Sequence, residues 1–446
     1  MPTTDTDSDT AHHSARIDAA DIDTGNIDTG DNDRKPAGST ATWVMTLFGT
    51  AVGAGILFLP LDAGKYGFIP LAFATVFILP LVYFSHRTYA RIVSGAPKKD
   101  HGKDVLELVT KYLGDKKGLV VAIFYWLGIY PTVLIYGVSI TNAVNSFIVN
   151  QLNGPEVPRP ILATLCVGIM TGAFAFGRRP MLWLAQILVY PLIIALAAVS
   201  VYLIPRWDVQ SFLHYESSAH DFGVLQGILL ILPVLVFSFS HMAGLSQFSL
   251  DMQPTYGDKT EKRVSRTELY TAIALVFFTM FFVWSCVLAL GADGMEEASA
   301  QNVPVLSYFA NVTGTPFMQY MTPVLVMCAI ITSYFGHMLG TEEGTEYLLK
   351  SAAPQWTERL NPTVLKHGIY VFVFVTVTLV AILNPSIMDL ISVVGGIFVV
   401  FLVYWLPVYI FKTVPEYKRF GRDPWNYFVV GMGVLTAGVT VWNLFH

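Results

Sequence analysis

The sequence predicts an all-α integral membrane protein with 11 transmembrane helices, two of which are broken inside the membrane. Three observations lead to this fold class. Of the 446 residues, 54% are hydrophobic and only 13% are charged, and the mean hydropathy is +0.54, whereas soluble domains have about 25% charged residues. Eleven apolar stretches are long enough to cross a bilayer. Glycines interrupt the first of these stretches.

The chain begins with a polar segment, residues 1–39, that is rich in Asp, Thr and Gly. It has too few large apolar side chains to form a packed core, and it lacks the apolar region of a signal peptide. We therefore expect a disordered, acidic and uncleaved tail on the cytoplasmic side. The transmembrane domain is expected over residues 40–446.

Eleven predicted spans follow the tail, each set by a run of apolar residues bounded by polar or charged ones. In chain order they are 41–62, 68–92, 118–150, 159–177, 181–205, 222–248, 266–291, 316–340, 364–384, 386–411 and 425–445.

The loop charges predict the orientation of the chain. With the amino terminus in the cytoplasm, 24 of the 27 Lys and Arg residues lie on the cytoplasmic side, and only Lys65, Arg159 and Arg206 lie opposite. This asymmetry agrees with the positive-inside rule. We expect a cytoplasmic amino terminus and, after an odd number of spans, a periplasmic carboxyl terminus.

The first span contains Gly49, Gly53 and Gly55 followed by a proline. A glycine costs roughly 1 kcal/mol relative to alanine in a helix interior, so this cluster predicts a break. A broken helix in hydrocarbon requires a protein-lined or wet cavity. The amides of Gly53, Ala54 and Gly55 would begin a half-helix whose positive dipole end binds a carboxylate. The alternative is that Gly49 and Gly53 form a small-residue packing seam in an unbroken helix.

The sixth span has a second predicted break, where Ser and His residues lie between Pro233 and Gly244. Interrupted spans in corresponding positions of two oppositely oriented halves indicate an inverted repeat with a binding site between them. We predict a 5+5 arrangement, with residues 40–205 as the first repeat, 222–411 as the second, and 425–445 as an accessory helix.

Placing a titratable side chain within a membrane span costs free energy, so such residues usually have a function. The ones that we single out are His241, His337 and Asp389, with Glu342 and Glu343 where the eighth span leaves the membrane. For the last four, helix packing or an interfacial position is the favoured interpretation. For His241, a substrate contact or proton relay and a neutral imidazole that satisfies the broken backbone remain equally open.

Three uncharged polar side chains are further candidates. Tyr136, near the middle of the third span, either lines the cavity or makes an interhelical hydrogen bond. Thr332 and Ser333 in the eighth span either bond back to their own helix or coordinate a small cation.

Several functions are excluded by what the sequence lacks. Cys166, Cys286 and Cys328 lie in apolar runs, so neither a disulfide framework nor a metal site is indicated. There is no basic patch with interleaved aromatics, and we expect no nucleic-acid partner. The spans contain no nucleophile–base pair, so we expect no enzyme activity and no cofactor.

Taken together, the motifs resemble those of bacterial serine/threonine permeases of the hydroxy and aromatic amino acid permease family. The matching stretches are 49–55 (GTAVGAG) with 58–60 (FLP), 140–142 (ITN), 236–239 (VFSF) with His241, 301–302 (QN) with 306–308 (LSY), and 383–386 (LNPS). The resemblance covers all eleven spans. It implies the amino acid-polyamine-organocation superfamily, a LeuT-like fold, and uptake of L-serine or L-threonine across the inner membrane, usually coupled to protons.

One departure from the family concerns the eighth span, where these permeases typically have Lys-Ser and this chain has Thr332-Ser333. Sodium-coupled relatives of the fold hold the ion with first-span carbonyls, an eighth-span carbonyl and a Thr-Ser pair. The matching positions are Gly49, Val52, Ala329, Thr332 and Ser333. Sodium coupling is therefore a hypothesis beside proton coupling; the alternative is that Thr332 only fills the space of the lysine.

The resemblance and the breaks together imply alternating access with a small amino acid, a coupling cation (H⁺ or Na⁺) and the lipid bilayer as partners. The substrate carboxylate would meet the amides of residues 53–55. Its ammonium would meet carbonyls near Phe237 and Ser238, and Ser240, His241 or Tyr136 would read its hydroxyl.

Two alternatives stay open. One is an aromatic amino acid permease, and the other, from a different class, is a membrane nutrient sensor on a transporter fold. A sensor is expected to carry a sizeable soluble signalling domain, which this sequence does not contain.

Overall fold

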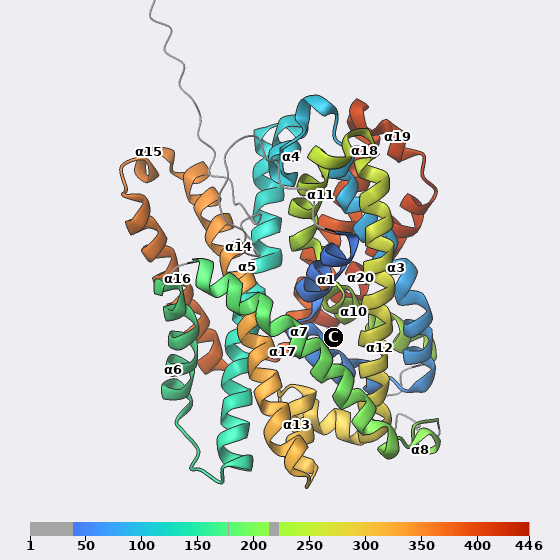
Figure 1. The fold of residues 1–446 in the computed structure, drawn as a ribbon, viewed down its shortest axis with the longest axis vertical. Coiled ribbons are helices and arrows are strands. Elements are labelled where there is room, and N and C mark those ends of the chain that lie inside the picture. Colours follow the sequence, from blue (N-terminus) through green and yellow to red (C-terminus); the bar gives the residue numbers. More distant parts are fainter. Residues whose placement is uncertain (1–38, 177, 214–222, 446) are drawn as a thin grey trace, which may run out of the picture. The chain divides into compact units, whose positions relative to one another are not determined.

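The computed structural model describes residues 39–176, 178–213 and 223–445, and within these residues all regular structure is helical (Figure 1). The predicted tail, except Ser39, lies outside the described residues. The all-helical class predicted from the composition is therefore confirmed over the described residues.

One set of helices corresponds in order to the predicted apolar stretches. They are α1 (Thr40–Ala51), α2 (Ala54–Lys65), α3 (Phe68–Ser94), α5 (Asp115–Ser146), α6 (Arg159–Gly172), α7 (Arg178–Leu203), α9 (Val224–Leu230), α10 (Leu232–Ser238), α11 (Met242–Tyr256), α12 (Thr260–Ala300), α14 (Thr322–Ala352), α16 (Pro362–Leu383), α17 (Ile387–Val393), α18 (Leu406–Thr413) and α20 (Trp425–Phe445).

Other elements connect or extend these helices. They are α4 (Val105–Leu113), α8 (Val209–Leu213), α13 (Val305–Val312), α15 (Pro354–Thr357), α19 (Lys418–Gly421), and the π-helical segments η2 (Phe147–Gln151), η6 (Phe317–Met321) and η7 (Val394–Trp405). The last of these joins α17 to α18 in one continuous helical run.

Seven helices in the described ranges are long and apolar enough to cross a membrane, or eight if the bent pair α1 and α2 forms one span. Three shorter apolar helices are Arg159–Gly172, Tyr190–Arg206 and Val224–Ser238. The prediction of a multi-pass membrane protein is confirmed. The count of eleven spans stays a prediction.

The seventh predicted span differs most from the structure. The apolar run 266–291 lies within α12, which begins six residues earlier, at Thr260; Gly291 is non-helical, with φ at +71°, and residues 292–300 form a separate short helix. α13 then follows in the region expected to be a loop. Hydropathy locates the part of a helix that suits lipid, but the helical hydrogen-bond pattern continues into polar sequence, so apolar runs underestimate helix length.

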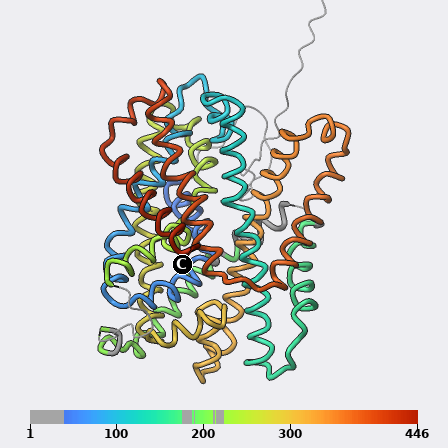
Figure 2. Tube along the Cα trace, turned by 180° about the vertical axis from the view of Figure 1, so that it is seen from behind, coloured from blue at the N-terminus to red at the C-terminus, as the bar shows by residue number. Residues whose placement is uncertain are grey.

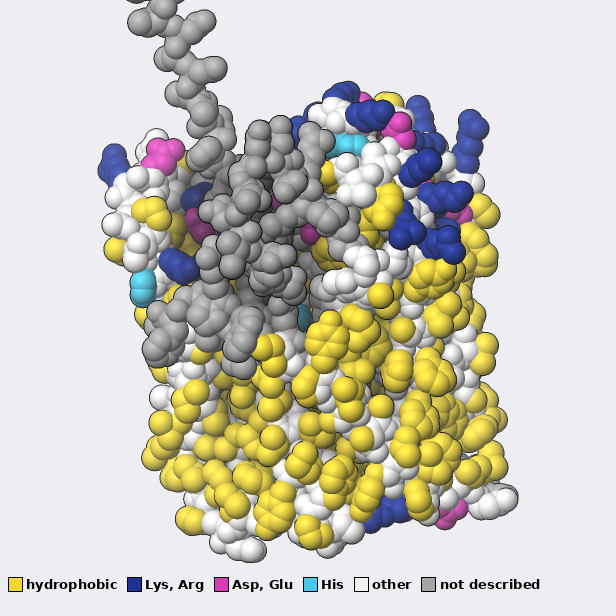
Figure 3. All heavy atoms as spheres, viewed as in Figure 1, with side chains coloured by type: hydrophobic (Ala, Val, Ile, Leu, Met, Phe, Trp, Pro, Cys, Tyr) yellow, Lys and Arg dark blue, Asp and Glu magenta, His cyan; other side chains and the backbone are white. Residues whose placement is uncertain are grey.

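Helices distant in sequence lie side by side. α5 packs along α14, α12 packs against α2 and α3, and α6 and α16 form a pair beside α5 (Figures 1 and 2). On the face drawn in Figure 3, hydrophobic side chains cover a broad band, and Lys and Arg gather mainly at the end that contains α4, α18 and α19. Large exposed apolar residues such as Ile169, Phe277 and Val371 are expected where a helix faces lipid.

At this basic end, α4 is a well-capped helix. The Asp104 carboxylate accepts from the Glu107 amide, and the Glu107 side chain accepts from the Asp104 amide, which is a capping box. Nearby, burial alone would raise the pKa of Asp100, but hydrogen bonds from Lys111, Tyr112 and Lys103 lower that pKa to about 2. These contacts stabilise the loop before α4.

Candidate functional site

The first break separates α1 from α2. α1 ends at Ala51, Val52 and Gly53 are extended, and the two half-helices meet at a bend of 63°. α2 begins at Ala54 without a side-chain cap. The first amides of a helix have no partner inside it and carry its positive dipole end. Residues 53–55 therefore present backbone donors rather than side chains.

The second break separates α10 from α11. α10 ends at Ser238, α11 begins at Met242, and residues 239–241 are not helical. The Ser240 amide donates to the Phe237 carbonyl at 3.1 Å, which ends α10 with a tight turn. Carbonyls at this helix end lack partners inside the helix and carry its negative dipole end. Both breaks predicted from the sequence are thus confirmed.

The two breaks touch each other. The Ser238 hydroxyl donates to the Gly55 carbonyl at 2.9 Å. A Cβ atom at Gly55 would lie 2.8 Å from the Ser238 Cα atom and 3.0 Å from the Phe237 ring. A backbone atom cannot move aside as a flexible side chain can, so only glycine allows this approach. The start of α2 and the end of α10 therefore form one site with amides on one side and carbonyls on the other.

Two further predicted residues, Tyr136 of α5 and Ser333 of α14, reach the first break. A Cβ atom at Gly53 would lie 2.8 Å from the Ser333 hydroxyl oxygen and 3.0 Å from the Tyr136 hydroxyl oxygen. The Tyr136 side chain is buried, and its ring lies edge-on to that of His337, with the ring centroids 5.3 Å apart. The structure thus brings Gly53, Gly55, Tyr136, Phe237, Ser238 and Ser333 together; the side chain of Ala54 lies outside the described part.

In the candidate cation site, two pairs of oxygen atoms each lie close together. The Ser333 hydroxyl is 3.4 Å from the Val52 carbonyl oxygen, and the Thr332 hydroxyl is 3.1 Å from the Ala329 carbonyl oxygen. Oxygen ligands around one hard cation have similar separations, because each lies about 2.4 Å from the ion. Thr332 also donates to the Cys328 carbonyl, so back-bonding to its own helix occurs here as well. Gly49 lies about one helical turn before Val52 on α1.

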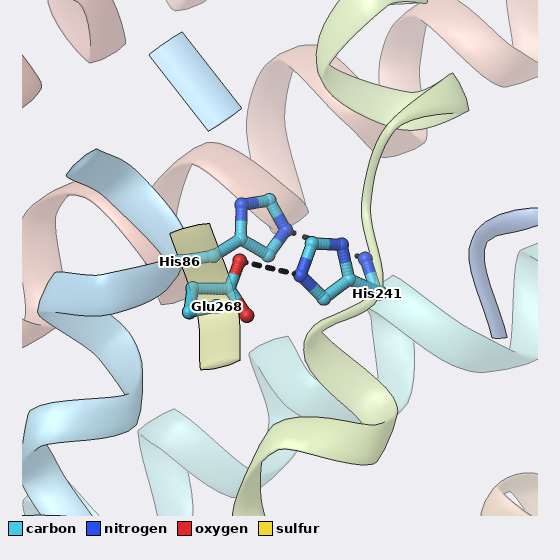
Figure 4. Close-up of side chains that lie close together, drawn as sticks. All are labelled: His86, His241 and Glu268. Carbon is cyan, nitrogen blue, oxygen red and sulfur yellow. Dashed lines mark hydrogen bonds and ion pairs between the residues drawn. The ribbon is translucent and has the colours of Figure 1, made fainter. Parts of the chain in front are cut away.

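His241 has its partners elsewhere. It is fully buried, and one ring nitrogen contacts the Phe239 carbonyl at 3.1 Å. The other contacts the Glu268 carboxyl at 2.7 Å, as Figure 4 shows. The interpretation that the imidazole satisfies the broken backbone is supported by the first contact. Ser240, which we grouped with His241 as a reader of the substrate hydroxyl, is half-buried in the same turn.

Sequence reasoning missed two residues of this region, His86 of α3 and Glu268 of α12. Both are buried, at 2% and 0% exposure. A signal was present, since both lie within predicted spans, where a titratable side chain is unusual. Glu268 was overlooked because it is only the third residue of the predicted span 266–291, and that span begins six residues too late.

The family motifs of three separate segments meet in one hydrogen-bond network. The Asn142 amide donates to the Asn302 carbonyl at 2.7 Å and to the Asn384 side chain at 3.1 Å. Asn302 in turn donates to Asn384 and to the Pro385 carbonyl. Asn302 and Asn384 both have positive φ angles, which asparagine tolerates better than most residues. This network ties α5, the segment before α13 and the segment before α17 together.

A small apolar cavity of about 20 Å³ adjoins the first break. Phe48, Val52 and Ile56 line one side, and residues of α7 and α12 line the other, with the Thr279 hydroxyl as its polar exception. Its apolar walls do not match a zwitterion, so we do not assign the substrate to it.

Comparison with known proteins identifies the family. The amino acid permease family profile matches residues 39–446. The serine transporter SdaC of Escherichia coli (strain K12) is 35% identical over 407 residues, which cover 90% of this chain and 94% of the relative. The threonine/serine transporter TdcC of Escherichia fergusonii is 35% identical over 428 residues, which cover 91% and 96%.

Among solved structures, MhsT in complex with L-phenylalanine matches with a TM-score of 0.54 at 15% identity, over 93% of this chain and 99% of that one. This likeness shows a shared LeuT-like fold. The named relatives are transporters, in agreement with the expectation that the chain is not an enzyme.

Proposed function

The chain belongs to the amino acid permease family, and from this premise we propose that it carries L-serine or L-threonine into the cell together with a cation. The observation that supports this most directly is the contact between the two breaks, where Ser238 bonds to the Gly55 carbonyl. Half-helix ends of opposite polarity suit a zwitterion, with its carboxylate at the start of α2 and its ammonium at the end of α10.

Close packing around the two glycines favours a small substrate. A Cβ atom at Gly55 would meet the Ser238 backbone, and one at Gly53 would meet the hydroxyls of Ser333 and Tyr136. The Tyr136 and Ser333 hydroxyls supply polar atoms for a substrate hydroxyl. The names of the serine and threonine/serine transporters agree with this substrate class.

We propose that the chain crosses the bacterial inner membrane with eleven spans in a 5+5 inverted repeat. The amino terminus would lie in the cytoplasm and the carboxyl terminus in the periplasm. The basic end formed by α4, α18 and α19 supports a cytoplasmic assignment for that end (Figure 3). The α1/α2 and α10/α11 breaks support the repeat because they occupy corresponding positions in the two halves.

A cation bound between α1/α2 and α14 would favour the loaded, outward-open state only if it binds the two states with different affinity. Sodium is supported by the Val52, Ala329, Thr332 and Ser333 oxygens, whose neighbouring pairs are 3.1 and 3.4 Å apart. A proton is supported by the usual behaviour of the family that the sequence resembles.

The decisive experiment is uptake of radiolabelled serine by the purified protein in liposomes, with sodium and proton gradients imposed separately. Serine accumulation that excess serine blocks and tryptophan does not is the expected result. Blocking by tryptophan alone would indicate an aromatic amino acid permease. Absence of both uptake and serine exchange would contradict transport and leave the sensor interpretation.

Thr332→Lys separates the two cations. If sodium drives uptake, the lysine ammonium occupies the position of the ion and sodium dependence disappears. If wild-type uptake never responds to external sodium, the sodium hypothesis is wrong. The control is Thr413→Lys, at an exposed hydroxyl at the end of α18 that donates to the Tyr409 carbonyl of its own helix.

A further inference from the structure

Three titratable side chains from three segments of the chain meet at the second break (Figure 4). His86 comes from α3, His241 from the residue before α11, and Glu268 from α12. One donor or acceptor atom of each lies within 4.8 Å of the others, and all three are buried. Burying titratable side chains inside a membrane domain costs free energy, so such a cluster usually has a function.

The hydrogen bonds of His86 define its protonation. Nδ1 lies 3.0 Å from the Val82 carbonyl oxygen, which can only accept, so Nδ1 carries a proton. Nε2 receives the backbone amide of His241 at 3.3 Å, so Nε2 has a free lone pair. His86 is therefore a neutral imidazole that anchors the backbone of the second break.

The hydrogen bonds of His241 show in the same way that one proton lies between His241 and Glu268. Nδ1 lies 3.1 Å from the Phe239 carbonyl oxygen and must donate to it. Nε2 lies 2.7 Å from the Glu268 Oε1 atom, and this short contact requires a proton on one of the two atoms. The pair is then either imidazole with carboxylic acid or imidazolium with carboxylate, and both forms are neutral overall.

Loss of that proton would leave a net negative charge at a fully buried position. The Glu268 Oε2 atom has no hydrogen-bond partner among the described residues. A buried carboxylate with a single hydrogen bond is strongly disfavoured, so loss of the proton requires a rearrangement of these contacts.

We propose that the His241–Glu268 pair is a proton-coupling site of the transporter, a role that rests on the proposed function. After one proton has left the pair, the imidazole of His241 is neutral and carries a single proton. That proton must lie on Nε2 to keep a hydrogen bond to the Glu268 carboxylate. Nδ1 then presents a lone pair to the Phe239 carbonyl and repels it. Since Phe239 is the first residue of the second break, the proton controls the geometry of the segment that holds the substrate.

The charged groups nearest to the cluster in sequence are Arg87 of α3, which pairs with Asp423 at 2.7 Å, and Arg266 of α12. Arg91 of α3 and Glu261 of α12 form an ion pair at 2.7 Å, one to two turns along their helices from the cluster. On η7, Tyr404 interacts with Ser85 beside His86. α1 and α10 contain no titratable residue, and α11 contributes Asp251 and Tyr256 in its second half.

A shared metal ion fits this geometry less well. The His86 and His241 rings stack with their centroids 4.1 Å apart and their planes 13° apart, so they face each other instead of aiming at a common point. All four ring nitrogens already have hydrogen-bond partners.

Glu268→Gln tests the proposal, because an amide can donate to His241 Nε2 as the protonated acid does but cannot release a proton. In liposomes, we expect serine exchange within about threefold of wild type. Serine accumulation driven by a pH gradient is expected to fall at least tenfold, and serine-induced proton influx to disappear. Glu268→Asp retains a titratable group and is expected to keep part of the proton-driven accumulation.

The matched control is Glu342→Gln, a buried carboxylate that accepts from the Tyr370 hydroxyl at 2.8 Å, for which proton-driven accumulation should persist. Wild-type accumulation by Glu268→Gln would overturn the proposal. So would identical behaviour of the Gln and Asp variants, since the group would then act by packing. Wild-type exchange without any proton movement refutes only this inference, whereas absence of wild-type exchange refutes the proposed function.

Discussion

The two helix breaks lie in contact but are built in opposite ways. The first, at Val52 and Gly53, has no titratable side chain and exposes amides because its glycines lack side chains. The second, at residues 239–241, is held by side chains: His241 bonds to Glu268, and His86 binds its backbone. A site that holds a zwitterion by backbone dipoles needs close approach, whereas a site that responds to protons needs titratable groups.

This difference suggests a division of roles. The glycine-lined break provides the shape of the site, because any added atom meets a backbone or side-chain neighbour within about 3 Å. The histidine-lined break provides a means to change that shape, because its hydrogen bonds depend on one proton. Changes at the first break should therefore affect binding, and changes at the second should affect coupling and stability.

The largest expected effect is at the first break. Gly55→Leu places a side chain where even a Cβ atom would be 2.8 Å from the Ser238 Cα atom, so we expect serine uptake to fall at least 100-fold while the protein still reaches the membrane. Gly438→Ala, at a helical position with no neighbour within 4 Å, is the control and should transport normally. Uptake at the wild-type rate by Gly55→Leu would remove the first break from the site.

At the second break, His241→Ala should lower stability more than removal of both partners. The single change leaves Glu268 buried without its partner, at a cost of about 3–5 kcal/mol in the free energy of unfolding. His241→Ala/Glu268→Ala removes the stranded group and should recover part of that loss. Unfolding in mixed micelles measures both; additive losses would mean that the two residues do not interact.

Removal of the hydrogen bond between the two breaks should have a smaller effect on uptake. Ser238→Ala removes the hydrogen bond to the Gly55 carbonyl, with a net value of about 1 kcal/mol, so we expect about a fivefold rise in the serine concentration for half-maximal uptake. Ser200→Ala removes a buried hydroxyl that bonds only to its own helix and serves as the control. An unchanged concentration dependence would show that this bond does not shape the site.

The smallest effect is expected outside the membrane, at Asp100. Its folded pKa of about 2 lies below the unfolded value of about 3.9, so its stabilising contribution is complete above pH 4 and is lost only as the pH falls toward 2. Asp100→Asn should therefore leave the pH profile of uptake between pH 5 and 8 unchanged. A shifted profile would show that the α4 loop, and not the second break alone, contributes to pH dependence.

The sequence alone determined the membrane class, the family resemblance and the position of both breaks. Composition decides which solvent a chain can face, and glycines at residues 53 and 55 weaken a helix wherever it lies. The sequence also singled out Tyr136 and Ser333, but it left open whether they line the cavity or bond within the helix bundle.

Only the tertiary structure decided which side chains meet across helices. Glu268 lies 27 residues from His241, and His86 lies 155 residues from it. Periodicity shows which residues share one face of a helix, but the rotation and depth of each helix are set by packing against all its neighbours. The cluster of His86, His241 and Glu268 therefore forms only when the helices pack together, and it cannot be recognised from any single span.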